Sequence, residues 1–355
     1  MKLHKIFAIA LLVLTAWGIY SIVKKGDPIL PSGIVPGSVA TSSATQQSST
    51  PQPSTPVAKT PPAPTQVQFC AEPSCGYGAI NTAVANAKTS VDLVMYELND
   101  QTIEQELIND AHRGVAVKVL LDQAYHGKYV NDPVVKYLSQ NGVPVKLAPN
   151  NIIVHEKAVI VDNDTMFILS GNLTTNYFAT SADWLVQDSQ PSDITAATAA
   201  FNGDWSGNVG GVEQGQVGDL IFSPHALGPY LALINSAKSS ILISSEEMIE
   251  PQVISALEDA AHRGVNVTLL MTASNLEPNV KQALIASGVH CDLLGSSGLY
   301  IHAKTLVVDG ETAIIGSQND STASLVYNRE LSVEFTSPSL VNGVIAAFHQ
   351  WMAAG

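Results

Sequence analysis

The pattern that most constrains this 355-residue chain is a motif that occurs twice. A histidine, a lysine two positions later and an aspartate five positions after the lysine recur, with the two histidines 147 residues apart. The first copy is His155, Lys157 and Asp162, and the second is His302, Lys304 and Asp309. Because side chains alternate faces along an extended strand, the histidine and lysine of each copy point the same way. The sequence therefore predicts two matched pairs of an imidazole and an ammonium group.

The two copies agree well beyond this motif. Each aspartate is followed 8 and 10 residues later by a serine and an asparagine, and each histidine 28 residues later by an acid. These residues are Ser170, Asn172 and Asp183 in the first copy, and Ser317, Asn319 and Glu330 in the second. An Ala-His-Arg-Gly-Val segment upstream also recurs, at an offset of 150. A shared order over roughly 145 residues is too long for a solenoid repeat and indicates a duplicated domain.

Strand and helix patterns alternate within each half. In the first half the expected helices cover 80–88, 102–112 and 133–140, and the expected strands cover 90–96, 115–121 and 143–147. Gly114 follows the second helix, as a C-terminal glycine does. This order predicts an α/β fold made of two duplicated α/β/α halves with mainly parallel sheets. We expect the halves to pack about a pseudo-twofold axis that brings both motifs to one cleft.

These motifs resemble those of the phospholipase D superfamily, over about residues 69 to 355. That family has two H-x-K-x4-D motifs, a G-S-x-N element after each, and a downstream acid. The second copy has the complete element, Gly316-Ser317-Gln318-Asn319. The first copy departs from it, with Leu169 in place of the glycine and Asp183 in place of glutamate.

The resemblance implies cleavage of a phosphodiester without a metal or cofactor. Such cleavage needs a nucleophile, an acid for the leaving oxygen and positive charge for the phosphoryl oxygens. By analogy with the family, His155 is the nucleophile that forms a phosphohistidine, and His302 is the acid that protonates the leaving alcohol. Lys157 and Lys304 are expected to hold the non-bridging oxygens. No cysteine and histidine cluster has metal-ligand spacing.

The remaining candidate residues have supporting roles. Asp183 and Glu330 are expected to accept hydrogen bonds from the distal imidazole nitrogens. Four residues are expected to donate neutral hydrogen bonds to the phosphate, namely Ser170, Asn172, Ser317 and Asn319. Asp162 and Asp309 belong to the catalytic motif, but their position beyond an apolar strand favours a role in tying the backbone together. The Glu246-Glu247 pair indicates a polar turn at a strand end.

The sequence before the repeats is of two other kinds. Residues 1–26 predict a membrane anchor or a signal peptide, because 6–23 has no charge and is just long enough to span a bilayer. The lack of a small-x-small cleavage site favours an uncleaved anchor. Residues 27–68 are rich in Pro, Ser, Thr and Gln and predict a disordered linker. The first repeat then covers 69–210 and the second 211–355.

This tether predicts a catalytic region displayed outside the cytoplasm, periplasmic or extracellular, and secreted if the N-terminal segment is cleaved. Cysteine usage is compatible with such a compartment. Cys70 and Cys75 flank a short loop and either form a disulfide or remain two thiols, while Cys291 is expected to be free. We expect a monomer, because the duplication supplies both half-sites in one chain.

Charge bears on the substrate. The chain has 17 Lys and Arg against 31 Asp and Glu, a net charge of −14, which disfavours binding of long nucleic acids. The leading hypothesis is a membrane-anchored phosphodiesterase that hydrolyses phospholipid to phosphatidic acid. The alternatives are an endonuclease of the same superfamily, whose compact repeats match these in length, and a phosphatidyl transferase resembling cardiolipin synthases. A binding module without activity is disfavoured, because the second motif is intact and the first nearly so.

Overall fold

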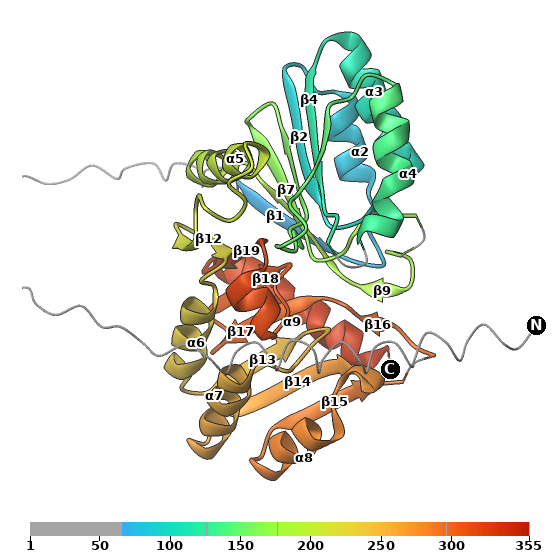
Figure 1. Ribbon diagram of the computed structural model, residues 1–355. Helices are drawn as coiled ribbons and strands as arrows, with labels where there is room; N and C mark the ends of the chain where they lie inside the picture. The colour runs from blue at the N-terminus through green and yellow to red at the C-terminus, as the bar shows by residue number, and fades with distance from the viewer. Residues whose placement is uncertain (1–65, 125–126, 176, 296, 355) are drawn as a thin grey trace, which may run out of the picture. The chain divides into compact units, whose positions relative to one another are not determined.

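A computed structural model describes residues 66–124, 127–175, 177–295 and 297–354. The expected anchor, 1–26, and nearly all of the expected linker lie outside the described residues. The described chain forms two halves, each built on one large sheet (Figure 1). None of the helices in these ranges is both long and apolar enough to cross a membrane.

The first half contains a seven-stranded sheet. In spatial order its strands are β1 (Val67–Ala71), β10 (Trp184–Asp188), β7 (Thr165–Leu169), β6 (Ala158–Val161), β2 (Ser90–Met95), β4 (Ala116–Leu121) and β5 (Val145–Leu147). One face carries α2 (Gly78–Ala85), α3 (Gln101–Arg113) and α4 (Gly127–Gln140). Asp100 caps the start of α3 by accepting from two backbone N–H groups, and Gly114 ends it with a φ of 87°.

The second half repeats this arrangement in an eight-stranded sheet. Its strands in order are β11 (Gly215–Val217), β12 (Leu220–Ser223), β19 (Glu330–Phe335), β18 (Thr312–Gly316), β17 (Lys304–Val308), β13 (Ser240–Ser244), β14 (Asn266–Thr272) and β15 (His290–Leu294). Its outer helices are α6 (Leu227–Ser236), α7 (Pro251–His262) and α8 (Pro278–Ala286). The predicted α/β fold of two duplicated halves is confirmed.

Strand directions refine the expectation of mainly parallel sheets. Parallel pairing is limited to β2, β4 and β5 in the first sheet and to β13, β14 and β15 in the second. Helices connect these strands, which is what parallel neighbours require. On the other side, β2 pairs antiparallel with β6 and β13 with β17. Tight turns then join the motif strands β6 and β17 to β7 and β18, so these pairs are antiparallel as well.

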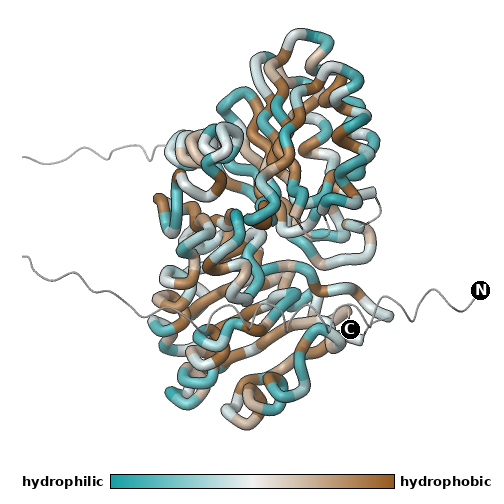
Figure 2. The backbone as a smooth tube through the Cα atoms, in the orientation of Figure 1, coloured by the Kyte–Doolittle hydropathy of each residue, from teal (hydrophilic) through white to brown (hydrophobic). Residues whose placement is uncertain are grey.

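The two halves share a central apolar core. Two helices contribute to it, α5 (Pro191–Trp205) and α9 (Pro338–Ala353), together with the inner faces of both sheets. Trp184 and Trp351 pack here with ring centroids 4.5 Å apart. Figure 2 shows the hydrophobic strands running inside both halves, with more hydrophilic stretches along the outer helices. Continuous burial across the boundary stabilises the two halves as one unit.

Short backbone pairings also cross the boundary, in a reciprocal pattern. Residues 300–301 of the second half (β16) pair in parallel with residues 181–182 of the first (β9). The corresponding contact, 147 residues away on each side, is a bridge between Val154 and Arg329. Reciprocal contacts of this kind are what the expected pseudo-twofold packing requires.

Arg329 adds a buried electrostatic link at this boundary. Its guanidinium bonds to Asp204 at 2.7 Å and lies 3.2 Å from Glu156, both in the first half.

At the edge of the first sheet, Cys70 and Cys75 form a disulfide, while Cys291 in β15 is a free thiol.

Candidate active site

The histidines of the two motifs lie just before the strands that follow them. His155 and Lys157 precede β6 in an extended segment that pairs with the other half, since the N–H of His155 donates to Arg329 O at 2.9 Å. In the same way, the N–H of His302 donates to Ala182 O at 3.2 Å. The sequence predicted these residues within the strands of their own sheets. The backbone N–H of each histidine instead bonds to the opposite half, which places both imidazoles at the boundary, while Lys304 begins β17 of its own sheet.

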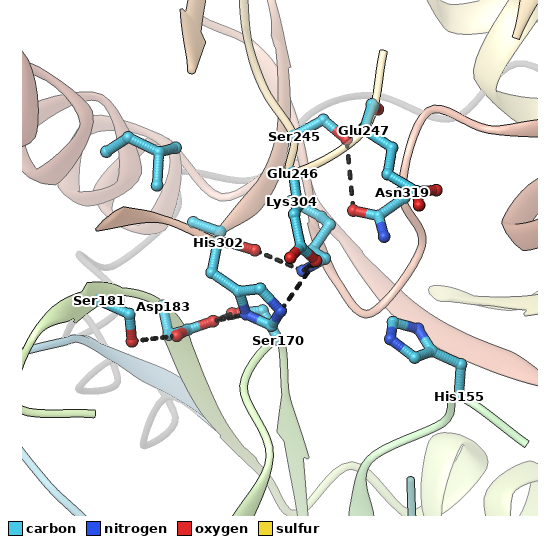
Figure 3. Close-up of polar contacts among 12 residues, drawn as sticks. His155, Ser170, Ser181, Asp183, Ser245, Glu246, Glu247, His302, Lys304 and Asn319 are labelled. Carbon is cyan, nitrogen blue, oxygen red and sulfur yellow. Dashed lines mark hydrogen bonds and ion pairs between the residues drawn. The ribbon is translucent and has the colours of Figure 1, made fainter. Parts of the chain in front are cut away.

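Each histidine is held by the acid of the opposite half. His155 Nδ1 donates to Glu330 at 2.8 Å, and His302 Nδ1 donates to Asp183 at 2.7 Å, the contact drawn in Figure 3. A hydrogen bond at Nδ1 fixes the tautomer and directs Nε2 to the reacting centre. The expectation that Asp183 and Glu330 accept from the distal imidazole nitrogens agrees with this geometry.

The serines serve the acids rather than a phosphate. Ser170 is fully buried, and its hydroxyl donates to Asp183 at 2.6 Å while accepting from the N–H of Trp184 at 2.7 Å. Ser317 is also fully buried and accepts from Leu331 N at 3.0 Å, and it hydrogen-bonds to Glu330. The prediction that Ser170 and Ser317 donate to the phosphate is therefore corrected, because these hydroxyls are already used to orient the carboxylates.

The asparagines lie closer to the open side of the site. Asn319 Oδ1 accepts from Ser245 at 3.5 Å, and Asn172 Nδ2 donates to Glu97 at 3.4 Å (Figure 3 shows the first pair). Both contacts are long for hydrogen bonds, so the amides retain capacity for a stronger partner. Asn172 and Asn319 remain the candidates for neutral contacts to the phosphate.

Both motif lysines are buried beside their histidines. Lys157 Nζ donates to the carbonyl of His155 at 2.6 Å, and Lys304 Nζ donates to that of His302 at 2.5 Å. Burial lowers the pKa of Lys157 to about 7, although the nearby Glu330 carboxylate acts to raise it. An anionic phosphoryl group in the site would favour the charged form of this lysine.

The pKa values of the two histidines are shifted in opposite directions. Burial lowers the pKa of His155 to about 4, although Glu330 opposes the shift, so at neutral pH its Nε2 carries a lone pair. Burial and Lys304 also act to lower the pKa of His302, but Asp183 and Glu246 outweigh them and raise it. One imidazole is therefore prepared as a nucleophile and the other as an acid.

Glu246 is a site residue that sequence reasoning missed. The Glu246-Glu247 pair indicated a polar turn, but the Glu246 carboxylate lies 3.1 Å from His302 Nε2 and 3.6 Å from Lys304 Nζ (Figure 3). One signal could have found it, since Glu246 stands 150 residues after Tyr96, whose ring packs on His155 with centroids 4.9 Å apart. Each half thus places the same loop position over its histidine.

Asp162 and Asp309 do not join the histidines. Asp162 accepts the N–H groups of Lys88, Thr89 and Ser90 at the far end of β6, and Asp309 does the same for residues 238–240. These carboxylates hold the turn that enters β2 in the first sheet and β13 in the second. They belong to the motif, but their role in the structure is to hold the backbone.

Two imidazoles at one boundary, one with a lowered and one with a raised pKa, with a lysine beside each, form a site typical of enzymes that cleave phosphodiesters through histidine. The family model described as cardiolipin synthase, PLD-like domain, matches residues 80–205 and 230–352, once in each half. The chain therefore belongs to this branch of the phospholipase D superfamily.

Individual proteins resemble this chain in sequence or in fold. The chain is 23% identical over 313 residues to cardiolipin synthase 2 of Staphylococcus epidermidis, covering 75% of this chain and 63% of that protein. It thus spans less than two thirds of that relative. The fold is shared with phosphatidylserine synthase of Haemophilus influenzae (TM-score 0.60, 15% identity, 80% of this chain and 86% of that one). It is also shared with polyphosphate kinase of Porphyromonas gingivalis (TM-score 0.65, 14% identity, 80% and 46%).

Proposed function

We propose that the protein is a phosphatidyl transferase, which moves a phosphatidyl group from one phospholipid to the hydroxyl of a second alcohol. The observation that supports this most is the pair of histidines at one boundary, each held by the acid of the opposite half, in a chain that matches the family model described as cardiolipin synthase, PLD-like domain. The sequence put hydrolysis first, but the family comparison favours the transferase alternative.

In the first step, Nε2 of His155 attacks phosphorus and forms a P–N bond. The bond from phosphorus to the headgroup oxygen breaks, and His302 gives its Nε2 proton to that oxygen, which releases the headgroup alcohol. Lys157 and Lys304 offset the charge on the phosphoryl oxygens as it shifts. Glu330 and Asp183 stabilise the cationic character of the two rings.

In the second step the neutral His302 takes the proton of the acceptor hydroxyl. The acceptor oxygen attacks phosphorus, the P–N bond breaks and His155 returns to its neutral form. Where the acceptor is the glycerol hydroxyl of a second phosphatidylglycerol, the product is a lipid with two phosphatidyl groups. Water as acceptor would give phosphatidic acid, so the same site can hydrolyse when no alcohol is present.

We also propose that the apolar segment at 6–23 holds the enzyme at a membrane, on the side outside the cytoplasm. This proposal rests on the sequence alone. The acidic charge of the chain makes electrostatic attraction to anionic lipid unfavourable, so an anchor would keep enzyme and substrate together.

The test is to incubate the full chain with phosphatidylglycerol vesicles and identify the products by mass spectrometry. We expect a lipid with two phosphatidyl groups together with free glycerol, and no product from the His155→Ala variant. Phosphatidic acid as the main product, with the same sensitivity to His155→Ala, would identify a hydrolase instead. A single-stranded DNA substrate, assayed in parallel, tests the endonuclease alternative.

A further inference from the structure

The carboxylate of Glu246 lies where the chemistry requires the substrate. Its Oε2 is 3.1 Å from Nε2 of His302 and 3.6 Å from Nζ of Lys304. Nδ1 of His302 is already bonded to Asp183, so Nε2 is the nitrogen left for the leaving oxygen. A phosphodiester can receive the proton of His302 and contact Lys304 only if the carboxylate gives up these two positions.

A carboxylate is a plausible substitute for a phosphoryl group at such a position. Both present two anionic oxygens to the same donors, and charge-assisted hydrogen bonds to either are strong. The second oxygen of Glu246, Oε1, accepts from the hydroxyl of Tyr300 at 2.7 Å. In the free enzyme, the Glu246 carboxylate therefore contacts His302 and Lys304, the groups expected to bind the substrate phosphate.

The first half carries no carboxylate at the matching position. Ser90 and Ser240 begin the corresponding strands β2 and β13, and six residues later stand Tyr96 and Glu246. The Tyr96 ring packs edge-on against His155, and Lys157 Nζ lies 5.3 Å from its centroid. The position that covers each histidine is thus aromatic in one half and anionic in the other.

The surroundings allow Glu246 to leave without unfolding the loop. Its side chain is 26% exposed, so displacement would need only a rotation of the side chain toward the solvent that it already contacts. The backbone stays anchored, because Asn275 donates to the carbonyl of Glu246 at 3.3 Å and to the Tyr300 hydroxyl at 2.9 Å. The aromatic rings of Tyr177 and Tyr300 pack around the other faces of His302.

We propose that Glu246 is a built-in competitor for the phosphoryl group, which occupies the second half-site in the free enzyme and is displaced by the substrate phosphate. This inference rests on the proposed function and deepens it. Because one anion replaces another, the charge next to His302 is the same before and after binding. His302 therefore remains a proton donor throughout, while any phosphodiester that binds must first displace the carboxylate.

The proposal is tested by the affinity of the full chain for inorganic phosphate, measured by isothermal titration calorimetry. Removing the competing charge in Glu246→Gln, and also its hydrogen bond in Glu246→Ala, should tighten phosphate binding roughly ten-fold, the effect of about one charge-assisted hydrogen bond. Glu247→Gln is the matched control. It removes a carboxylate from the residue next to Glu246, whose side chain hydrogen-bonds to Ser321 instead of contacting His302.

Each outcome decides the question. Tighter binding in the Glu246 variants but much less in Glu247→Gln supports displacement. Equal tightening in both variants would reduce the effect to general electrostatics and overturn the proposal, and so would unchanged or weaker binding in Glu246→Gln. Phosphate binding needs no turnover, so this result is independent of the vesicle assay. If phosphate affinity responds as expected but no lipid is transferred, the competitor stands and the proposed substrate is wrong.

Discussion

Glu330 accepts a hydrogen bond at 2.8 Å from Nδ1 of His155, a residue 175 positions earlier in the chain and in the opposite half of the molecule. Asp183 makes the reciprocal contact with His302 at 2.7 Å. The duplicated motifs therefore do not form two separate sites. Each acid acts on the histidine of the other copy, which gives the first prediction.

Replacing Glu330 by glutamine should lower kcat by about 100-fold, because the amide keeps the shape but no longer stabilises the positive charge that develops on His155. Asp183→Asn should act in the same direction through His302. The measurement is kcat on a water-soluble phosphodiester, with circular dichroism to show that the fold is retained. Wild-type kcat in either variant would mean that the cross-half hydrogen bonds have no catalytic role.

The roles of the two histidines can be separated with a p-nitrophenyl phosphodiester. Its leaving group is weakly basic and needs no proton, so His302→Ala should still release a burst of about one equivalent of p-nitrophenol as the phosphohistidine forms. His155→Ala should release none. Stopped-flow absorbance resolves the burst from slow turnover, and the opposite pattern would exchange the two roles.

The pH profile of kcat/KM should reflect the unlike histidines. Burial lowers the pKa of His155 to about 4, so its neutral, nucleophilic form is lost only as the pH falls toward 4. The raised pKa of His302 keeps its acid form until the pH passes above the ordinary value of 6.5. We expect a plateau between an acidic limb near pH 4 and a basic limb above 6.5. An acidic limb close to 6.5 would contradict this assignment.

The serine of the first motif should affect catalysis more than substrate binding. Ser170→Ala removes the hydroxyl that orients Asp183, so kcat should fall roughly ten-fold while KM changes little. Asn319→Ala is the comparison, since an amide that contacts the phosphate should mainly change KM. Steady-state kinetics on the same soluble substrate distinguish the two, and a large rise in KM for Ser170→Ala would restore the original phosphate-binding prediction.

Asp162 should matter for stability rather than for chemistry. Asp162→Ala leaves the amides of residues 88–90 without their acceptor, which should cost about 1–3 kcal/mol of unfolding free energy. Burial acts to raise the pKa of Asp162, but the backbone hydrogen bonds together outweigh it and lower the pKa. This contribution is therefore present above the unfolded pKa and is lost as the pH falls through the folded value. Chemical denaturation measures the loss, and kcat at a temperature well below Tm should stay near wild type.

Much of the fold was accessible from the sequence because the duplication supplied an internal comparison. The alternation of strands and helices, the C-terminal glycine of α3 and the pairing of motifs in one site all follow from local patterns. Helix α4 begins at Gly127, before the predicted start at Pro133, because the first turns of that helix carry no strong apolar periodicity. Strand direction was less accessible, since tight turns after each motif reverse the chain.

The sequence predicted which residues form the site better than it predicted the contacts among them. Spacing identified the histidines, the lysines and both acids, yet spacing within one half does not show which acid reaches which histidine. The sequence assigned Ser170 to the phosphate, and its actual contact with Asp183 was missed because that contact depends on packing between strands. Glu246 was overlooked because a glutamate after a strand resembles any polar turn until the opposite half brings His302 beside it.

Each half supplies the acid for the histidine of the other half, and this arrangement also determines how activity depends on protein concentration. A chain that carried a single half would have an imidazole without its carboxylate, and would need to meet a second copy before it could react. In the fused chain the partner is always present at a high effective concentration, fixed by the shared core rather than by the amount of protein. Activity per molecule should therefore be the same at nanomolar and micromolar enzyme.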